Sequence, residues 1–120
     1  MRYARMYADE SGESHFEDID VAMAPGSIPP PAIPANRSEP MAAGAIRFLE
    51  FPPGLNVNHP APTRQFFIVL SGEVRVTTSD GESRTFAAGD VGLAEDTTGK
   101  GHETVCAGTA SAYLAITELQ

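Results

Sequence analysis

The sequence is poor in cysteine, and Cys106 is the single one in 120 residues. One thiol cannot form an intramolecular disulfide, and one cysteine cannot build a cysteine-based zinc site. A nucleophilic thiol needs a neighbouring cation that lowers its pKa. His102, which precedes Cys106 on the same predicted strand, would lie about 13 Å away along that strand. We therefore expect Cys106 to be a buried structural thiol.

Basic residues are also scarce. Eight lysines and arginines stand against sixteen aspartates and glutamates, which gives a formal net charge of −8 at pH 7. A charge of this sign repels the phosphate backbone of nucleic acids and the surface of an anionic membrane. We therefore expect no nucleic acid and no membrane among the partners of this protein.

Long apolar runs are missing as well. The longest are far shorter than the roughly 20 residues that span a bilayer. The opening residues, MRYARMYADESGE, lack the apolar core of a signal peptide. These two features predict a cytoplasmic protein. The length fits a single domain, which can bury roughly two thirds of its unfolded surface in one core.

Convincing helical periodicity is also missing. A 3.6-residue pattern is possible over residues 110–119, but Tyr113, Ile116 and Thr117 favour a strand there. Short stretches rich in β-branched and aromatic residues alternate instead with turns that contain glycine, proline or aspartate. Asp80 and Gly81 give the clearest hairpin signal, because both central residues of a type I′ turn require positive φ. They predict that residues 83–87 pair back onto residues 74–78. The whole pattern is typical of an all-β sandwich or barrel.

Two segments precede the predicted barrel core of residues 45–119. Residues 1–24 are expected to form a loose β-hairpin, in which His15 and Glu17 share one face. Those two side chains belong either to a solvated strand edge or to the mouth of a site. Residues 25–40 hold six of the ten prolines, so they predict a polyproline II strap across the domain rather than a regular strand. Recruitment of a proline-reading partner is the alternative role for this segment.

The most informative stretch is residues 59–73, HPAPTRQFFIVLSGE. Its apolar run, residues 66–70, predicts a buried strand. Alternate side chains of a strand face opposite sides. If Gln65 points to the interior, Phe67 and Val69 do so too. The outward-facing residues are then Phe66, Ile68 and Leu70.

The same alternation applies to the strand that begins at His102, where Thr104 and Cys106 share the face of His102. One inward orientation then gives a cavity that contains His102 and Gln65, with His59 near its rim. Two imidazoles that converge in an apolar cavity can hold a divalent metal or bind a ligand directly. The predicted metal ligands are His59, Gln65 and His102. The predicted pocket-lining residues are Phe67, Val69, Thr104 and Cys106, and no catalytic residue is assigned.

Two stretches resemble the motifs of the cupin superfamily, a small β-barrel of the jelly-roll type that is often dimeric. Residues 54–72 resemble the first motif, G-x5-H-x-H-x3,4-E-x6-G, and residues 89–106 resemble the second, G-x5-P-x-G-x2-H-x3-N. The loop EDTTGKGH, together with HPAPTRQ and ESHFEDID, looks like a group of small bacterial cupin-domain proteins of undefined activity. The resemblance implies an all-β double-stranded β-helix over roughly residues 45–119, with little or no helix.

A typical cupin holds iron, manganese, nickel or zinc with three histidines and a glutamate. In this chain the first motif places its histidines on His59 and Ala61 and its glutamate on Gln65. The second motif places its histidine on His102, if the loop is two residues longer, and its asparagine on Cys106. One imidazole and the anionic ligand are therefore replaced. The resemblance thus implies either one divalent metal ion of this group or none.

Three functions remain open from the sequence. The first is a metal-assisted oxygenase, isomerase or lyase that acts on a small organic molecule. The second is a non-catalytic cupin that binds a small ligand, and the third is an accessory domain with a vestigial site. The resemblance also implies a homodimer, which would cover Phe66, Ile68 and Leu70 unless the N-terminal segments cover them within one chain.

Overall fold

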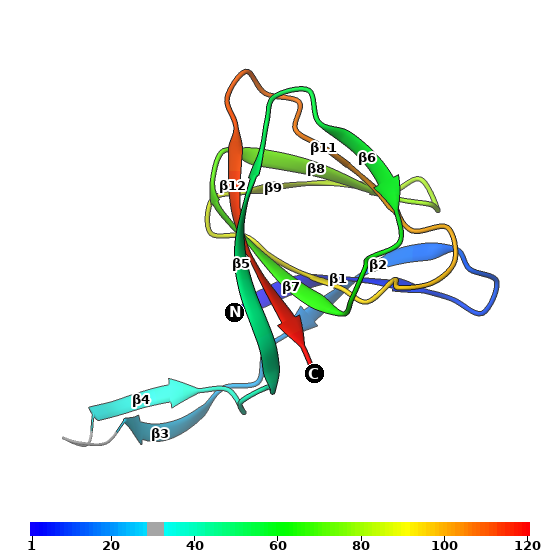
Figure 1. Ribbon diagram of the computed structural model, residues 1–120. Coiled ribbons are helices and arrows are strands. Elements are labelled where there is room, and N and C mark those ends of the chain that lie inside the picture. The colour runs from blue at the N-terminus through cyan, green and yellow to red at the C-terminus, as the bar shows by residue number, and fades with distance from the viewer. Residues whose placement is uncertain (29–32) are drawn as a thin grey trace.

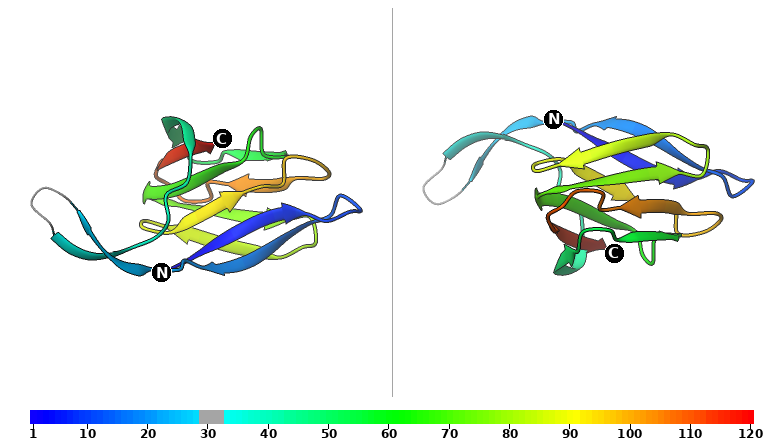
Figure 2. Two further views of the ribbon diagram at one scale, coloured as in Figure 1. Left: turned by 90° about the horizontal axis from the view of Figure 1, so that it is seen from below. Right: turned by 90° about the horizontal axis from the view of Figure 1, so that it is seen from above.

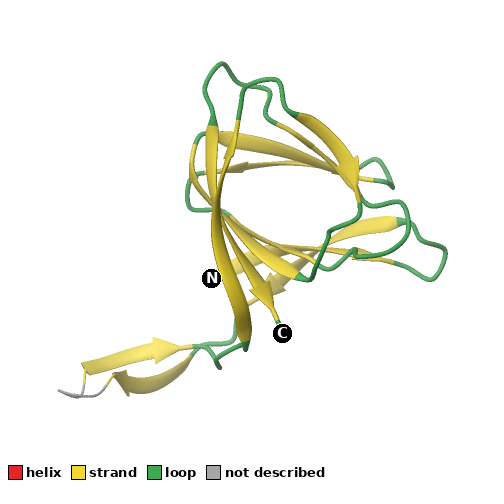
Figure 3. Cartoon of the chain, viewed as in Figure 1, coloured by secondary structure: helices red, strands yellow, loops and turns green. Residues whose placement is uncertain are grey.

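The computed structural model describes residues 1–28 and 33–120. This part of the chain consists of strands and loops and contains no helix (Figure 3). Most strands belong to two sheets that face each other across a common interior (Figure 1). The predicted all-β jelly-roll fold is therefore confirmed, although the two sheets are not joined into a closed barrel. Over the same residues, no helix is long and apolar enough to cross a bilayer.

The larger sheet combines strands from the beginning, the middle and the end of the chain. Its strands are β1 (Arg2–Ala8), β2 (Ser14–Asp20), β5 (Ala43–Phe51), β7 (Gln65–Ser71), β10 (Val91–Ala94) and β12 (Ala112–Leu119). They lie in the order β2-β1-β10-β7-β12-β5. Only β1 and β10 run parallel in this sheet. A parallel pair needs a long connection, and the whole intervening chain supplies it.

The smaller sheet is antiparallel and carries the two histidines of the predicted site. Its strands are β6 (Asn56–His59), β8 (Glu73–Thr78), β9 (Ser83–Ala87) and β11 (His102–Val105). They lie in the order β6-β11-β8-β9. His59 ends β6 and His102 begins β11, and the register of the two strands places them opposite each other.

The core lies between the sheets, where alternate residues of the facing strands point inward. Met6 and Val69 of the larger sheet and Val74 and Val76 of the smaller one are almost fully buried in it. Burial of such a side chain contributes about 1.5–3 kcal/mol relative to leaving it exposed. Cys106 also belongs to this cluster, as expected for a structural thiol.

Strand β7 has the orientation that its sequence predicted. Phe67 is 8% exposed and Val69 is 1% exposed. Phe66 faces outward and packs edge-to-face against Tyr3, with ring centroids 5.1 Å apart. Ile68 also lies on this outer face and is exposed.

The β8–β9 hairpin forms as predicted, with Thr77 opposite Ser83 at its end. Its turn is not type I′, because Gly81 has φ +94° whereas no residue other than glycine has positive φ among the described residues. The loop is longer than two residues, since Thr78 donates its backbone N–H to Glu82 at 3.0 Å. A longer loop needs only one left-handed residue, so Asp80 keeps an ordinary backbone conformation.

The N-terminal hairpin also forms as predicted, from β1 and β2 in antiparallel register. Its second strand ends at Asp20, earlier than the sequence indicated. Phe16 points from this strand to the core and packs near Phe86 of β9. The hairpin thus extends the larger sheet and closes one side of the interior.

The proline-rich segment differs from the prediction. Strands β3 (Ala24–Ile28) and β4 (Ile33–Arg37) pair with each other, and Pro25 and Pro34 sit within this ladder. They form an arm that stands away from the two sheets in each view (Figure 2). The prediction of a polyproline II strap is therefore wrong for residues 24–28 and 33–37. A two-stranded ribbon has two free edges, so a proline that faces an edge removes no hydrogen bond. The central prolines, residues 29–31, lie outside the described residues.

Candidate functional site

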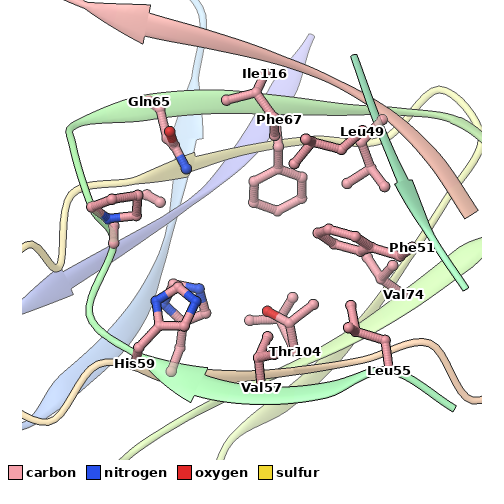
Figure 4. Close-up of a pocket in the computed structure, with 16 residues that line it drawn as sticks. Leu49, Phe51, Leu55, Val57, His59, Gln65, Phe67, Val74, Thr104 and Ile116 are labelled. Carbon is pink, nitrogen blue, oxygen red and sulfur yellow. The ribbon is translucent and has the colours of Figure 1, made fainter. Parts of the chain in front are cut away.

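A cavity of about 280 Å³ lies between the two sheets. Most of its wall is apolar and comes from both sheets, with Leu49, Phe51 and Phe67 on the larger one. Its polar lining residues are His59, Gln65, His102 and Thr104. Figure 4 shows His59 and Gln65 toward one end of the pocket and Phe51 and Leu55 toward the other. The pocket therefore has one polar end and one apolar end.

The two histidines lie side by side at the polar end. Their ring centroids are 6.2 Å apart, because the antiparallel register of β6 and β11 places them directly opposite each other. His59 is exposed at the rim, whereas His102 is partly buried. Gln65 begins β7 on the opposite sheet. The structure therefore brings the three predicted metal ligands, His59, Gln65 and His102, to one end of one pocket.

A buried aspartate fixes the orientation of His102. Nδ1 of His102 lies 2.6 Å from Oδ2 of Asp96, whose side chain is fully buried. A neutral His102 therefore carries its proton on Nδ1, and this N–H donates a hydrogen bond to the carboxylate. The backbone oxygen of Asp96 accepts a hydrogen bond from the N–H of Ala61 at 3.0 Å. Asp96 thus connects His102 to the chain that leads from His59 to Gln65.

His59 is fixed in the same tautomer by the main chain. Its Nδ1 lies 2.6 Å from the carbonyl oxygen of Pro60 and donates a hydrogen bond to it. Among the described residues, no hydrogen bond uses Nε2 of His59 or of His102. In the neutral form each Nε2 therefore keeps a lone pair that is not used by the protein. Both lone pairs are available to a metal ion or to a hydrogen-bond donor of a ligand.

Gln65 completes the polar end. The hydroxyl of Thr63 donates to Oε1 of Gln65 at 3.3 Å, which leaves the amide NH₂ group free to donate elsewhere. Figure 4 shows this amide nitrogen pointing toward the interior of the pocket. The polar end therefore offers two acceptors, the imidazole nitrogens, and one amide donor.

Two of the four predicted lining residues do line the pocket, namely Phe67 and Thr104. Val69 lies deeper along β7 and is packed in the core. Cys106 follows the end of β11, and its thiol donates to the carbonyl oxygen of Ala110 at 3.6 Å. Strand parity predicted the inward orientation of both residues correctly, but it does not tell how far along the strands the cavity reaches.

His15 and Glu17 do not reach the pocket. Both ring nitrogens of His15 bind aspartates at the surface, and Glu17 pairs with Arg5 at 2.8 Å. The solvated strand edge is therefore the correct one of the two alternatives.

Glu95 anchors the start of the loop that leads to His102. It pairs with Arg5 at 2.7 Å and also with Arg64. Burial pushes the pKa of Glu95 upward, but the hydrogen bonds from Arg5 and Arg64 outweigh it, so the pKa lies below the ordinary value. Glu95 therefore stays ionised at neutral pH and holds the loop to β1 and to the entry of β7.

The family follows from comparison of the sequence with known families. Residues 46–110 match the EutQ-like cupin domain, which is more than half of the chain. The chain belongs to the EutQ-like cupin family. No curated protein matches it.

Several solved structures share the cupin fold. A protein of unknown function from Rhizobium leguminosarum superposes with a TM-score of 0.53 at 21% identity, over 62% of this chain and 69% of that one. A Klebsiella pneumoniae protein with a double-stranded β-helix domain gives 0.51 at 22% identity, over 62% and 64%. A cupin domain of a transcriptional regulator from Enterobacter cloacae gives 0.50 at 15% identity, over 62% and 80%. At these identities the likeness concerns the fold alone.

The residues present do not make the four-ligand metal centre that a cupin usually carries. Ala61, where the motif has its second histidine, contributes only a buried methyl group to the lining. Gln65 is uncharged where the motif has its glutamate. Among residues 1–28 and 33–120, no group of three or more histidine, cysteine, aspartate or glutamate side chains could hold a metal ion. The largest donor set in this cupin pocket is two imidazoles and one amide.

Asp96 is the site residue that sequence reasoning missed. The sequence places it in a loop between two strands, where an aspartate is most often a turn residue. Its role depends on how residues 97–101 fold back and bring His102 to its carboxylate. The spacing of six residues between them gives no sign of that contact, because it corresponds to no regular periodicity.

Proposed function

We propose that this cupin binds one small, mainly apolar molecule whose polar group faces His59, Gln65 and His102. The composition of the pocket wall carries this proposal. Sixteen residues line the cavity and only four of them are polar, namely the three just named and Thr104. No lysine, arginine, aspartate or glutamate is among these sixteen. A phosphorylated or multiply charged molecule would lose its hydration there without finding a charged partner.

The size of the cavity limits the ligand further. Ligand pockets of proteins usually measure about 300–1,000 Å³, so a cavity of about 280 Å³ is slightly smaller than this range. A single ring or a short branched chain fits such a volume. Apolar contacts with Leu49, Phe51 and Leu55 supply the favourable free energy, at about 25 cal/mol for each Å² of apolar surface removed from water.

The polar end selects the functional group of the ligand. Nε2 of a neutral imidazole accepts a hydrogen bond, and the Gln65 amide donates one. A hydroxyl group can satisfy both kinds of partner, and a carbonyl or carboxylate group can accept from Gln65 and from a protonated imidazole. Small alcohols, phenols, ketones and monocarboxylic acids are therefore the compounds to test.

Thermal denaturation in the presence of such compounds tests the proposal. A ligand that binds only the folded state raises the melting temperature, by an amount that grows with the ratio of its concentration to its Kd. We expect a rise with a small phenol or short monocarboxylic acid that persists in the presence of a chelator and is lost in His102→Ala. Sugar phosphates serve as the charged comparison and should give no rise. A rise with sugar phosphates but with none of the apolar compounds would contradict the proposal.

A metal-assisted enzyme is the second candidate, and one observation favours it. In both histidines the Nδ1–H donates a hydrogen bond to a protein oxygen, and Nε2 has no hydrogen bond among the described residues. This is the usual arrangement of metal-binding histidines. Such a metal would be bound by His59, His102 and Gln65, and in cupins it supplies oxygenase, isomerase or lyase chemistry. Elemental analysis of protein purified without a tag or chelator tests this candidate. Stoichiometric iron, manganese, nickel or zinc that disappears in His102→Ala would support it, and absence from both proteins after incubation with metal salts would exclude it.

We also propose that the protein is a cytoplasmic homodimer. The net charge of −8 and the lack of long apolar runs support the location. The outer face of the larger sheet supports the dimer, because large apolar side chains are exposed there on neighbouring strands. They are Ile46 and Phe48 of β5, Ile68 and Leu70 of β7 and Tyr113 of β12.

A further inference from the structure

His15 joins two aspartates that belong to different turns. Its Nε2 lies 2.7 Å from Oδ2 of Asp9, and its Nδ1 lies 3.0 Å from Oδ2 of Asp80. A neutral imidazole has only one N–H and can donate to only one of these carboxylates. Both hydrogen bonds exist together only when the ring is a doubly protonated imidazolium. The geometry alone therefore makes this contact dependent on the protonation of His15.

Each aspartate also organises its own turn through its other oxygen. Oδ1 of Asp9 accepts hydrogen bonds from the backbone N–H groups of Ser11 and Glu13, at 2.9 and 3.1 Å. Oδ1 of Asp80 accepts from the Thr78 hydroxyl at 2.6 Å and from the N–H of Glu82 at 3.1 Å. His15 therefore binds the turn between β1 and β2 to the turn between β8 and β9.

The β1–β2 turn also holds residues 97–101, which we call the site loop. The backbone N–H of Lys100 donates to the carbonyl oxygen of Gly12 at 2.9 Å, and the Lys100 ammonium pairs with Glu13 at 2.6 Å. The hydroxyl of the fully buried Ser14 donates to the carbonyl oxygen of Gly101 at 2.6 Å. Three contacts therefore fasten the site loop to the β1–β2 turn and to the first residue of β2.

The opposite side of the site loop touches the histidine pair. Gly101 packs so closely on the main chain of His59 that an added Cβ would lie 2.3 Å from its carbonyl carbon. The next residue after Gly101 is His102. The site loop is thus held between the β1–β2 turn on one side and His59 on the other, and its position sets the positions of both imidazoles.

We propose that His15 is a pH-dependent latch, which in its protonated form holds the site loop and the two pocket histidines in place. Loss of its proton breaks one of the two contacts to aspartate, loosens the β1–β2 turn and increases the opening of the site loop. The consequence for ligand binding rests on the proposed function of the pocket. The latch itself does not, because it concerns contacts at the surface of the protein.

The groups around His15 fix the direction of the pH dependence. The hydrogen bond to Asp9 raises the pKa of His15 most strongly, burial opposes it, and the hydrogen bond to Asp80 adds to it. The pKa values of Asp9 and Asp80 are lowered, so both carboxylates stay ionised near neutral pH. A histidine with a raised pKa stabilises the folded state fully below its unfolded pKa of about 6.5. This stabilisation is lost as the pH rises through the higher folded pKa.

Other charged groups near His15 are held in ion pairs with each other. The Tyr7 ring lies 5.5 Å from the His15 ring, and the guanidinium of Arg5 lies 4.6 Å above Tyr7. Arg5 is paired with Glu17, on the same face of β2 as His15. The Lys100 ammonium and Glu13 pair with each other, which raises the pKa of Lys100 and lowers that of Glu13. His15, whose pKa is raised above its ordinary value, is therefore the group in this cluster that we expect to lose its charge as the pH rises.

Amide exchange of Lys100 tests the latch in the full-length protein without a ligand. Its N–H is bonded to Gly12, so its exchange with deuterium, measured by NMR, reports opening of the site loop. After correction for intrinsic exchange rates, we expect its protection factor to fall at least about threefold between about pH 6 and about pH 8.5. Equal protection at the two pH values would overturn the latch.

Two variants make the assignment specific. In His15→Gln, which has no titrating group, we expect low protection of Lys100 at both pH values. In Asp20→Asn, which removes the exposed pair with Arg2 on the same hairpin, the pH dependence should remain. A pH dependence that persists in His15→Gln would overturn the assignment to His15. If that variant does not fold, NMR of the wild-type protein gives the pKa of the His15 ring. That pKa must then coincide with the pH at which the Lys100 amide loses its protection. Failure of every ligand to bind would contradict the pocket proposal and would leave the exchange result unchanged.

Discussion

Asp96 is the residue on which the polar end of the pocket depends, although its own side chain lies outside the pocket lining. It is fully buried and bonds His102 at 2.6 Å through one oxygen. Its other oxygen, Oδ1, has no partner among the described residues. An incompletely satisfied buried carboxylate costs stability. Its presence is therefore explained by the orientation that it imposes on His102.

Truncation of Asp96 should lower the stability of the protein, because His102 loses its hydrogen-bond acceptor. In Asp96→Ala the Nδ1–H of His102 becomes a buried donor without an acceptor, which costs about 1–3 kcal/mol. Urea denaturation measures this change in the free energy of unfolding. Asp96→Asn keeps an acceptor oxygen and should lose less. If Asp96→Ala were as stable as Glu39→Gln, a change at an exposed position, the contact with His102 would not be a stabilising one.

At the scale of residues, the sequence predicts the orientation of side chains better than their hydrogen-bond partners. The alternation along β7 correctly predicts that Phe67 points inward and Phe66 outward, because side chains of any strand alternate. The contact between Asp96 and His102 depends on the path of the loop between them. That path is set by packing against Gly12 and His59, which are distant in the sequence.

At the scale of elements, the site loop is shaped by its glycines. Gly99 and Gly101 have φ +78° and +72°, in the left-handed region that favours glycine. Both also pack against main chain, since an added Cβ would lie 2.4 Å from the Gly12 carbonyl oxygen and 2.3 Å from the His59 carbonyl carbon. Close packing of backbone on backbone thus connects the N-terminal hairpin to the histidine pair.

A pair of matched glycine substitutions separates the effect of positive φ from the effect of close backbone packing. Gly81 also has positive φ, but an added Cβ there meets nothing within 4 Å. Gly81→Ala should therefore cost only the conformational strain, about 1–2 kcal/mol. Gly101→Ala carries the same strain and also displaces His59 or the loop, so its cost should exceed about 3 kcal/mol. Chemical denaturation of both variants provides the comparison, and equal costs would show that the loop does not pack on His59 as described.

Elements with strong turn signals were predicted well, and the proline-rich arm was not. The β8–β9 hairpin follows from Asp80 and Gly81 with apolar alternation on both sides. Prolines indicate the absence of a hydrogen-bond donor, but they do not show whether that position faces a neighbour or a free edge. In the arm, the ladder pairs Pro25 with Asn36 and Ser27 with Pro34, and the composition of the segment alone does not reveal this pairing.

At the scale of the whole molecule, one apolar surface has no partner among residues 1–28 and 33–120. Strand β5 ends the larger sheet and pairs only with β12 on one side. Phe48 is 72% exposed and Ile46 is 64% exposed on its outer face. The N-terminal hairpin covers Phe66 through Tyr3 but leaves Leu70 exposed at 50%. A second copy that covers this face would bury contiguous apolar surface and an open sheet edge together.

A charge on this face should separate the proposed dimer. In Phe48→Glu, burial of an unpaired carboxylate in each half of a symmetric interface opposes association, so sedimentation should show a monomer. Thr85→Glu, at an exposed position of β9 on the other sheet, is the matched control and should remain dimeric. A monomeric wild-type protein at micromolar concentration would contradict the dimer.

The global fold was predictable because turns, alternation and motif spacing all indicate the same jelly roll. The composition of the pocket was predictable only in part. The two histidines and Gln65 follow from motif spacing, but the apolar residues of β5 and the loop after it line the pocket only because the two sheets pack at this distance. The resulting apolar wall, on which the proposal of an apolar ligand rests, is a property of the assembled molecule.

We propose that the pocket takes a small apolar molecule with its polar group at the histidine pair. NMR titration of the labelled protein with phenol tests it most directly, because both ends of the pocket carry their own reporters. We expect saturable shifts of the Leu55 and Val74 methyl groups together with the ring protons of His102. A metal chelator should leave these shifts unchanged, and toluene, which lacks the hydroxyl group, should shift the methyl groups but bind more weakly. Shifts confined to surface residues, or histidine signals that respond to divalent metal and to no organic molecule, would contradict the account.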